Sequence, residues 1–420
     1  MKEGKKTAVP KLRFPEFRNA GSWDQRTLNE LLRERKQRNR DLKFGPDQVL
    51  SVSGDHGCVN QIELLGRSYA GVSVKEYHVV ETGDLVYTKS PLKKNPYGII
   101  KENKGKPGIV STLYAVYRVT ELGHPAYLDH YFSRDYNLNS YLQPIVRKGA
   151  KNDMKVNNAA VLTGDVLAPQ MAEQKKIANC LTSLDELITT QGRKIEALKT
   201  YKRGLMQQLF PRKGETAARL RFPEFRDAPE WKKTTLGQVI EVASGLVDPT
   251  KPPYCDLPHV GGENIESDTG VIRNVNTAKE LQLISGKYAF DESYVLYSKI
   301  RPALNKVAVP GFIGICSADI YPIRPSNSDL HRDYLVYLLL SEAFLKYATK
   351  HSDRSKIPKV NRDALLAYTV SLPAIEEQQR IADSLSSLNA FIADESAKLG
   401  AIKTHKDGLM QQLFPLPEEA

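Results

Sequence analysis

The chain has 420 residues and is 41% hydrophobic, so it is long enough to bury a substantial core and exceeds the size of one typical domain. Lys and Arg outnumber Asp and Glu by 60 to 49, and the resulting charge of +11 favours a polyanionic partner, although many basic proteins are simply soluble. The four cysteines lack the spacing of a disulfide framework or a zinc site, which favours a reducing cytoplasm, and no apolar run is long enough to cross a membrane.

A segment near the start of the chain is repeated later. KLRFPEFRNAGSWDQRTLNELL, from Lys11, returns as RLRFPEFRDAPEWKKTTLGQVI, from Arg219, with Trp23 and Trp231 separated by 208 residues. Self-similarity over such a distance is typical of a duplicated architecture. We therefore expect two copies of one structural frame.

The stretches that follow these segments differ between the copies. Residues 33–152 and 241–356 share little beyond fragments such as VYTKS (86–90) and LYSKI (296–300). A repeated frame that carries two different middle regions is suited to a protein that recognises two different short nucleotide sequences. The alternative is a gene duplication whose middle regions drifted without functional meaning.

Both middle regions predict small mixed domains. Short β-rich runs, such as LVYTK, GIIK and IVSTLYAVYRV in the first and SYVLYSKI, KVAVPGFIGI and ADIYPIRP in the second, alternate with Gly, Pro and Asn. A helical patch follows in each, at 125–142 and 331–350, with aromatic and aliphatic residues at core spacing. The fold class is therefore α+β.

Basic residues cluster at corresponding places in the two middle regions, where loops would be offered to DNA. Lys and Arg can neutralise phosphates, while Arg, Asn and Tyr can read base edges. Any single one of these residues could equally well be a solvated surface charge. The hypothesis of DNA contact therefore rests on their occurrence at corresponding places in both copies. The candidate DNA contacts are Lys89, Lys93, Lys94, Arg147, Lys148, Lys151 and Lys155 in the first copy, and Lys299, Arg301, Lys306, Arg354, Lys356 and Lys359 in the second.

A long helix with a heptad seam follows each middle region. The helices lie between Pro169 and Pro211 and between Pro373 and Pro415, and about 38 residues at roughly 1.5 Å each give a rod of about 57 Å, longer than one turn of DNA. We favour pairing within one chain, since both copies carry matching seams, over dimerisation with another chain. The seam residues are Ile177, Leu181, Leu184, Ile188, Ile195 and Leu198 in the first copy, and Ile381, Leu385, Leu388, Ile392, Leu399 and Ile402 in the second, with polar residues at Gln191, Lys202, Glu395 and Lys406.

These features divide the chain into four segments. Residues 1–168 form an amino-terminal segment with the first recognition domain, and 169–211 form the first helix. Residues 212–372 form the second recognition domain, and 373–420 the second helix and a tail.

Motifs for catalysis are missing or imperfect. Residues 251–254 spell KPPY, similar to the Asp/Asn/Ser-Pro-Pro-aromatic loop of amino-methyltransferases, but Lys251 is donor-only and cannot accept a hydrogen bond from a base amino group. The sequence contains neither GxxxxGK[ST] nor HExxH. An enzyme is not indicated.

The repeated frame resembles the specificity subunits of type I restriction-modification systems. The resemblance rests on Glu173-Gln174 before Ile177-Ala178, on Glu377-Gln378 before Ile381-Ala382, and on the shared ending GLMQQLFP, and it covers almost the whole chain. It implies two target recognition domains that read a bipartite, asymmetric site in double-stranded DNA. It also implies two methyltransferase subunits as partners, joined for restriction by motor-nuclease subunits.

The resemblance further implies that this chain binds no cofactor. S-adenosylmethionine, ATP and Mg would belong to the partner subunits, and the complex would work in the cytoplasm of a bacterium or archaeon, associated with the nucleoid. Three rival interpretations stay open: a coiled-coil adaptor that binds only proteins, a self-contained DNA-modifying enzyme, and a transcriptional regulator, which would more naturally show a helix-turn-helix motif.

Overall fold

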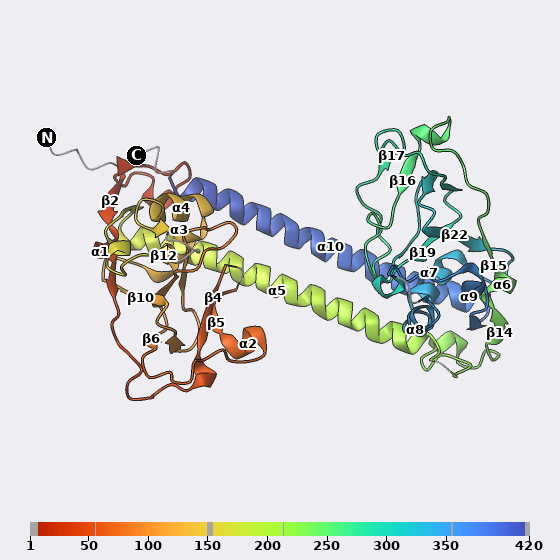
Figure 1. Ribbon diagram of the computed structural model, residues 1–420, viewed down its shortest axis with the longest axis horizontal. Helices are drawn as coiled ribbons and strands as arrows, with labels where there is room; N and C mark the ends of the chain where they lie inside the picture. Colours follow the sequence, from red (N-terminus) through yellow and green to blue (C-terminus); the bar gives the residue numbers. More distant parts are fainter. Residues whose placement is uncertain (1–6, 55, 149–153, 213, 354–355, 416–420) are drawn as a thin grey trace. The chain divides into compact units, whose positions relative to one another are not determined.

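The computed structural model describes residues 7–54, 56–148, 154–212, 214–353 and 356–415, which form two compact units (Figure 1). The first unit comprises residues 1–191 and 398–420, and the second comprises 192–397. Each unit contains one of the two middle regions and one half of each long helix. The units therefore do not follow the linear division into four segments, because both helices pass from one unit into the other.

The first unit is built on an antiparallel sheet in the order β3-β10-β7-β8. The Trp23 segment adds a second sheet, β1-β2-β13, and smaller pairs, β4-β5, β6-β9 and β11-β12, extend from the domain. The elements are β1 (Thr7–Ala8), β2 (Trp23–Thr27), α1 (Leu28–Leu31), β3 (Leu32–Glu34), β4 (Leu50–Ser53), β5 (Gly57–Asn60), α2 (Gln61–Leu65), β6 (His78–Val80), β7 (Leu85–Thr88), β8 (Ile99–Glu102), β9 (Gly108–Val110), β10 (Tyr114–Val119), α3 (Pro125–Ser133), α4 (Asp135–Leu142), β11 (Arg147–Lys148), β12 (Met154–Lys155) and β13 (Asp165–Ala168).

The second unit repeats this design with different residues. Its main sheet has the order β15-β22-β19-β20, again antiparallel, and a further sheet runs β17-β16-β21-β18. The elements are β14 (Lys232–Thr235), α6 (Leu236–Val239), β15 (Ile240–Val242), β16 (Pro258–Val260), β17 (Asn276–Thr277), β18 (Tyr288–Phe290), β19 (Val295–Ser298), β20 (Val307–Ala308), β21 (Gly314–Cys316), β22 (Ile320–Pro325), α7 (Arg332–Leu340), α8 (Glu342–Lys350), α9 (Arg362–Leu366) and β23 (Thr369–Leu372).

The pairings show that the two middle regions share one topology. β16 runs parallel to β21 through His259 and Ile315, and the first unit has a parallel bridge at the same place, between Val49 and Ile109. β18 and β6 lie antiparallel to β21 and β9 in the same way. The predicted α+β fold with two related domains is confirmed, although the sequences of these regions share little.

The two predicted long helices are also confirmed. They are α5 (Met171–Leu209) and α10 (Ile375–Leu413), each of 39 residues. Every predicted apolar seam residue is buried or half-buried. In the first unit Lys406 of α10 pairs with Asp185 of α5, and in the second Lys194 of α5 pairs with Glu395 of α10 at 2.7 Å. The helices of one chain therefore pack antiparallel within each unit.

The carboxyl end of each long helix is buried in the core of a recognition domain, α10 in the first unit and α5 in the second. Phe414, just after α10, packs with its ring centroid 5.5 Å from that of Tyr127 on α3. Phe210, just after α5, stacks on Tyr334 of α7 with 5.2 Å between centroids. The repeated ending GLMQQLFP is therefore explained by the burial of its Leu and Phe.

The repeated residues at the start of each helix make the same contacts in both copies. The Arg13 guanidinium donates two hydrogen bonds of 2.7 Å to the Glu173 carboxylate. The Arg221 guanidinium likewise donates two, of 2.8 and 2.6 Å, to the Glu377 carboxylate. Such bidentate pairs are geometrically specific. The RFPEF segments are thus tied to the helices of their own chain.

The neighbouring glutamines join each helix to the turn that precedes the domain's own helical pair. Gln174 accepts a hydrogen bond from the amide of His124 at 3.0 Å and donates to the carbonyl of Leu122 at 3.0 Å. Gln378 accepts from the amide of His331 at 2.9 Å and donates to the carbonyl of Asp329 at 2.8 Å. The Glu-Gln pairs therefore fix the frame that carries each variable domain.

Candidate nucleic-acid interface

The fold brings together two basic stretches of the second unit. Ile300, just after β19, forms a bridge with Lys359. The amide of Arg301 donates to the carbonyl of Pro358 at 2.7 Å, and the amide of Val360 donates to the carbonyl of Lys299 at 2.9 Å. Residues more than 50 positions apart in the sequence are thus joined through their backbones. Side chains of both stretches can therefore act on one ligand.

The charges at this junction affect one another. The Lys299 ammonium lies 4.9 Å from the centre of the Tyr321 ring, and burial lowers the pKa of Lys299, an effect to which the nearby charges of Lys359 and Arg362 contribute. Clustered cations of this kind attract phosphate oxygens. Arg301, Lys356 and Lys359 are exposed. We refer to Lys299, Arg301, Lys356, Lys359 and Arg362 as the second basic cluster.

Lys306 and Arg354, the other predicted contacts of the second copy, are not counted in this cluster. The Lys306 ammonium donates a hydrogen bond to the carbonyl of Gly262, which occupies one of its donors. Arg354 lies outside the described residues. Arg362, which sequence reasoning missed, donates from Nη2 to the carbonyl of Ala243 at 2.7 Å. It escaped notice because it lies beyond the basic loop, at the start of α9.

In the first unit, Lys89 occupies the place of Lys299. It follows β7 as Lys299 follows β19, and these strands hold equivalent positions in the two sheets. Burial lowers the pKa of Lys89, opposed by the Glu34 carboxylate. Because Asn158 donates to Glu34 at 2.7 Å, the segment after β12 shares this carboxylate with Lys89. The correspondence suggested by VYTKS and LYSKI is therefore structural as well.

The loop after Lys89 is exposed but anchored. Lys93 and Lys94 are exposed, and the carbonyl of Lys94 accepts a hydrogen bond from Asn139 of α4 at 3.1 Å. Asn95 is buried and donates to Asp135 at 2.8 Å. The lysines are therefore presented from a fixed backbone.

Three other predicted contacts of the first copy, Arg147, Lys148 and Lys155, lie on two short paired strands. Arg147 is exposed and pairs with Lys155 across β11 and β12, and Lys148 pairs with Met154. The sequence placed these residues in a loop, but backbone pairing makes them part of two strands. Lys151 lies outside the described residues.

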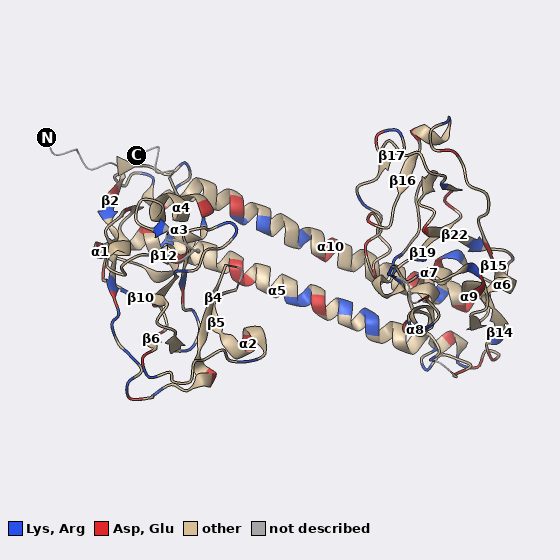
Figure 2. Cartoon of the chain, viewed as in Figure 1, with Lys and Arg blue, Asp and Glu red and all other residues tan. Residues whose placement is uncertain are grey.

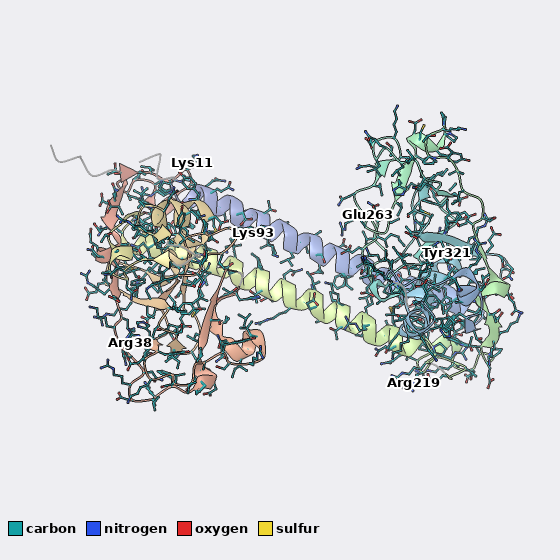
Figure 3. All side chains as sticks on the ribbon, viewed as in Figure 1. Lys11, Arg38, Lys93, Arg219, Glu263 and Tyr321 are labelled. Atoms are coloured by element: carbon teal, nitrogen blue, oxygen red, sulfur yellow. The ribbon has the colours of Figure 1, made fainter. Side chains whose placement is uncertain are left out.

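A further basic surface in the first unit was not among the predicted contacts. Six of the eleven residues in 33–43 are Lys or Arg. Of these, Arg33, Lys36, Arg40 and Lys43 are exposed, and Arg38 donates to the carbonyl of Glu76 at 2.7 Å. The charges along this segment are visible in Figure 2, and Figure 3 labels Arg38 away from Lys93 within the unit. The high density of Lys and Arg in 33–43 could have indicated this surface, but it has no counterpart in the second copy and so did not stand out as a repeated feature.

Among the described residues, no group of three or more His, Cys, Asp or Glu side chains could hold a metal ion. The KPPY stretch is a turn in which Lys251 lies 3.8 Å from Asp248 and is otherwise exposed. No helix within the described ranges combines the length and apolar character needed to span a bilayer.

Comparison with known proteins identifies relatives of one kind. Residues 229–404 match a family model described as the type I restriction modification DNA specificity domain. The chain is 28% identical over 271 residues to the type I restriction enzyme EcoDI specificity subunit of Escherichia coli, covering 59% of this chain and 58% of that subunit. It is 26% identical over 258 residues to the MjaVIII specificity subunit of Methanocaldococcus jannaschii, covering 59% and 60%. The chain thus spans about three fifths of the length of these relatives.

A solved structure shows the same fold over nearly the whole chain. The type I restriction-modification system S subunit from M. genitalium covers 97% of this chain and 99% of its own, with a TM-score of 0.59 and 12% identity. Fold and repeat together define a class of protein in which two related α+β domains are carried by a pair of long helices. With the sequence matches, they make the chain similar to the specificity subunits of type I restriction-modification systems.

Proposed function

We propose that this chain is the DNA sequence-recognition subunit of a type I restriction-modification complex, reading a bipartite asymmetric site with one half-site for each domain. The supporting observation is that one sheet topology is used twice, with different loops and different basic surfaces. A dimer of identical readers would favour a symmetric site, whereas two different readers in one chain favour an asymmetric one.

Recognition would combine positioning and readout. Exposed Lys and Arg of the second basic cluster, and Lys89, Lys93, Lys94 and Arg147 in the first unit, would neutralise phosphates and set the register of each domain. Fewer side chains would then read base edges in the grooves. Binding should accordingly weaken steeply as salt rises.

The chain itself would be non-catalytic. The repeated frame offers two equivalent surfaces, so two methyltransferase subunits could each dock on one half, and motor-nuclease subunits would add restriction. S-adenosylmethionine, ATP and Mg would be bound by those partners, in the cytoplasm and on chromosomal DNA. A methyltransferase must flip its target base, so this chain would hold the duplex in place for that step.

The test is single-molecule methylation sequencing of a host that carries this chain with its methyltransferase, compared with the same host lacking the gene. We expect a split, asymmetric motif that is present only with the chain. Exchanging residues 33–152 for those of another specificity subunit should alter one half-site and leave the other unchanged. Unchanged methylation without the gene would instead favour the alternative, a coiled-coil adaptor that binds only proteins.

A further inference from the structure

Part of the first unit forms a separate lobe with its own small core. Residues 36–49 and 61–79 enclose a cluster in which Phe44, Val49, Val74 and Val79 are buried with Ile109 of β9. We call these two segments the basic lobe. Because these five apolar side chains are buried against one another, they hold the lobe in one folded shape.

Side-chain hydrogen bonds to the backbone fix the lobe further. The buried Asn39 amide donates to the carbonyls of Phe44 at 2.8 Å and Val74 at 3.3 Å, which joins the two segments. Ser68 donates to the carbonyl of Pro46 at 2.7 Å. The surface of the lobe is therefore held by contacts beneath it and between its segments, so little conformational freedom would be lost on binding.

Large apolar side chains nevertheless point outward from this rigid lobe. Leu42 is 59% exposed, Tyr69 56%, Leu65 50% and Val72 fully exposed. Leu42 also has φ of 52°, a left-handed conformation that is unfavourable for leucine. Single exposed apolar residues are ordinary, but several on one structured lobe are typical of a binding surface.

Exposed cations belong to the same lobe as these apolar side chains, and one of them, Arg40, lies 3.6 Å from the Glu76 carboxylate. The Arg67 guanidinium lies 4.6 Å from the centre of the Tyr69 ring, and Lys36, Arg40 and Lys43 are exposed on the neighbouring segment. Over the two segments of the lobe, Lys and Arg outnumber Asp and Glu by six to four. The combination of an excess of positive charge with an exposed aromatic ring fits a polyanion whose bases can stack, and fits a protein surface less well.

We infer that the basic lobe is a DNA-contacting element of the first domain, in which Leu42, Tyr69 and Val72 press against bases or sugars while Lys36, Arg40 and Lys43 hold the backbone. This inference rests on the proposed function and deepens it. The corresponding segment of the second unit, residues 243–257, carries Asp248, Lys251 and Asp256, so its charge is not positive. The apolar contact would let the first domain distort its half-site, because wedged side chains unstack base steps.

The first test is photocrosslinking. A photoreactive benzoylphenylalanine at Val72 of the full chain, assembled with its methyltransferase, should crosslink to labelled duplex DNA containing the motif found by methylation sequencing. The same group at Leu122, an exposed residue of the turn bound by Gln174, is the matched control and should not crosslink to DNA. Crosslinking of the Val72 position to a protein subunit, or to nothing, would overturn the inference.

The second test separates apolar from ionic contacts. The variant Leu42→Asn/Tyr69→Ser/Val72→Ser should lose about tenfold or more in affinity with little change in the salt dependence of binding. Asparagine tolerates the conformation of Leu42, so folding is not at risk. The variant Lys36→Gln/Arg40→Gln/Lys43→Gln should lower that salt dependence. If the unaltered complex binds no specific DNA, the proposed function fails; if it binds and both variants bind equally well, only the inference about the lobe fails.

Discussion

At the scale of single residues, the repeated Arg-Glu pairs make a prediction about stability. The side chains of Arg13 and Glu173 are only 7% and 3% exposed. Removing one charge from a buried pair leaves the other without compensation, which costs about 3 kcal/mol. Glu173→Gln should therefore lower the free energy of unfolding by about that amount in urea titrations. Glu16→Gln, which breaks the exposed pair with Lys176, is the control and should change the free energy of unfolding far less. Equal losses in the two variants would contradict the structural role of the buried pair.

A second prediction at this scale concerns pH. Glu102 lines a cavity of about 880 Å³ in the first unit, and burial, with the charge of Asp129, raises its pKa from 4.5 to about 7. An acid with a raised pKa binds its proton more tightly in the folded state, so its contribution to stability is lost as pH rises from about 4.5 to about 7. Glu102→Gln should remove this loss and stabilise the chain by about 1 kcal/mol at pH near 8, after allowance for solvent screening.

Urea titrations at several pH values would check this. The gain for Glu102→Gln should disappear below pH 4.5, where the Glu102 carboxyl is protonated in both the folded and the unfolded chain. Glu63→Gln, at an exposed carboxylate lining the same cavity, provides the control. A pH-independent effect of Glu102→Gln would show that the change in shape, and not the proton, is responsible.

At the scale of elements, the two domains are joined to the long helices by different chemistry. In the first unit, His130 of α3 contacts Thr182 at 3.2 Å and lies 3.9 Å from Asp185, which pairs with Lys406. The equivalent residues of the second unit form a neutral set. Tyr337 shares a hydrogen bond of 3.0 Å with Ser386 and accepts one of 3.0 Å from Asn389.

This difference can be tested by replacing the residues that join α3 to α5 in the first unit with their equivalents from the second unit. We call each of these sets of residues a junction. Asp185→Asn alone should destabilise the first unit by about 0.5 to 1 kcal/mol, since it leaves the Lys406 ammonium without its carboxylate and the pair is partly exposed. Adding His130→Tyr and Thr182→Ser, which completes the neutral set, should recover most of that loss. Thermal melts at low and high salt would check both variants, with Glu186→Gln as the control for an exposed charge on α5. A triple variant less stable than the single one would show that the junctions are not interchangeable.

The same elements show what could be predicted from the sequence. The long helices were predictable because their heptads are a local pattern. The helical patches were predicted as continuous, but each breaks, at Arg134 and at Ser341, where the serine side chain accepts a hydrogen bond from the amide of Phe344 and caps α8. The shared sheet topology could not be predicted from the sequence, because strands pair through residues far apart in the chain and these residues differ between the two copies. The second basic cluster was only partly predictable for the same reason, since the bridge between Ile300 and Lys359 leaves no local signal.

At the scale of the whole molecule, the repeated frame turns a change in helix length into a prediction about the DNA site. If the two helices set the distance between half-sites, a matched deletion should shorten the spacer. Removing residues 187–193 from α5 and 396–402 from α10 takes out one heptad from each helix, and retains both Asp185–Lys406 and Lys194–Glu395. Seven helical residues correspond to about 10 Å, or about three base pairs.

Methylation sequencing would then report the same two half-sites with a spacer about three base pairs shorter. Deleting the heptad from α5 alone is the control, because it removes the seam partner of the intact helix and should destabilise the chain without producing a new motif. An unchanged spacer in the matched deletion would mean that the distance between half-sites is fixed by the partner subunits. In that case, the helices would serve only to join the two recognition domains in one chain.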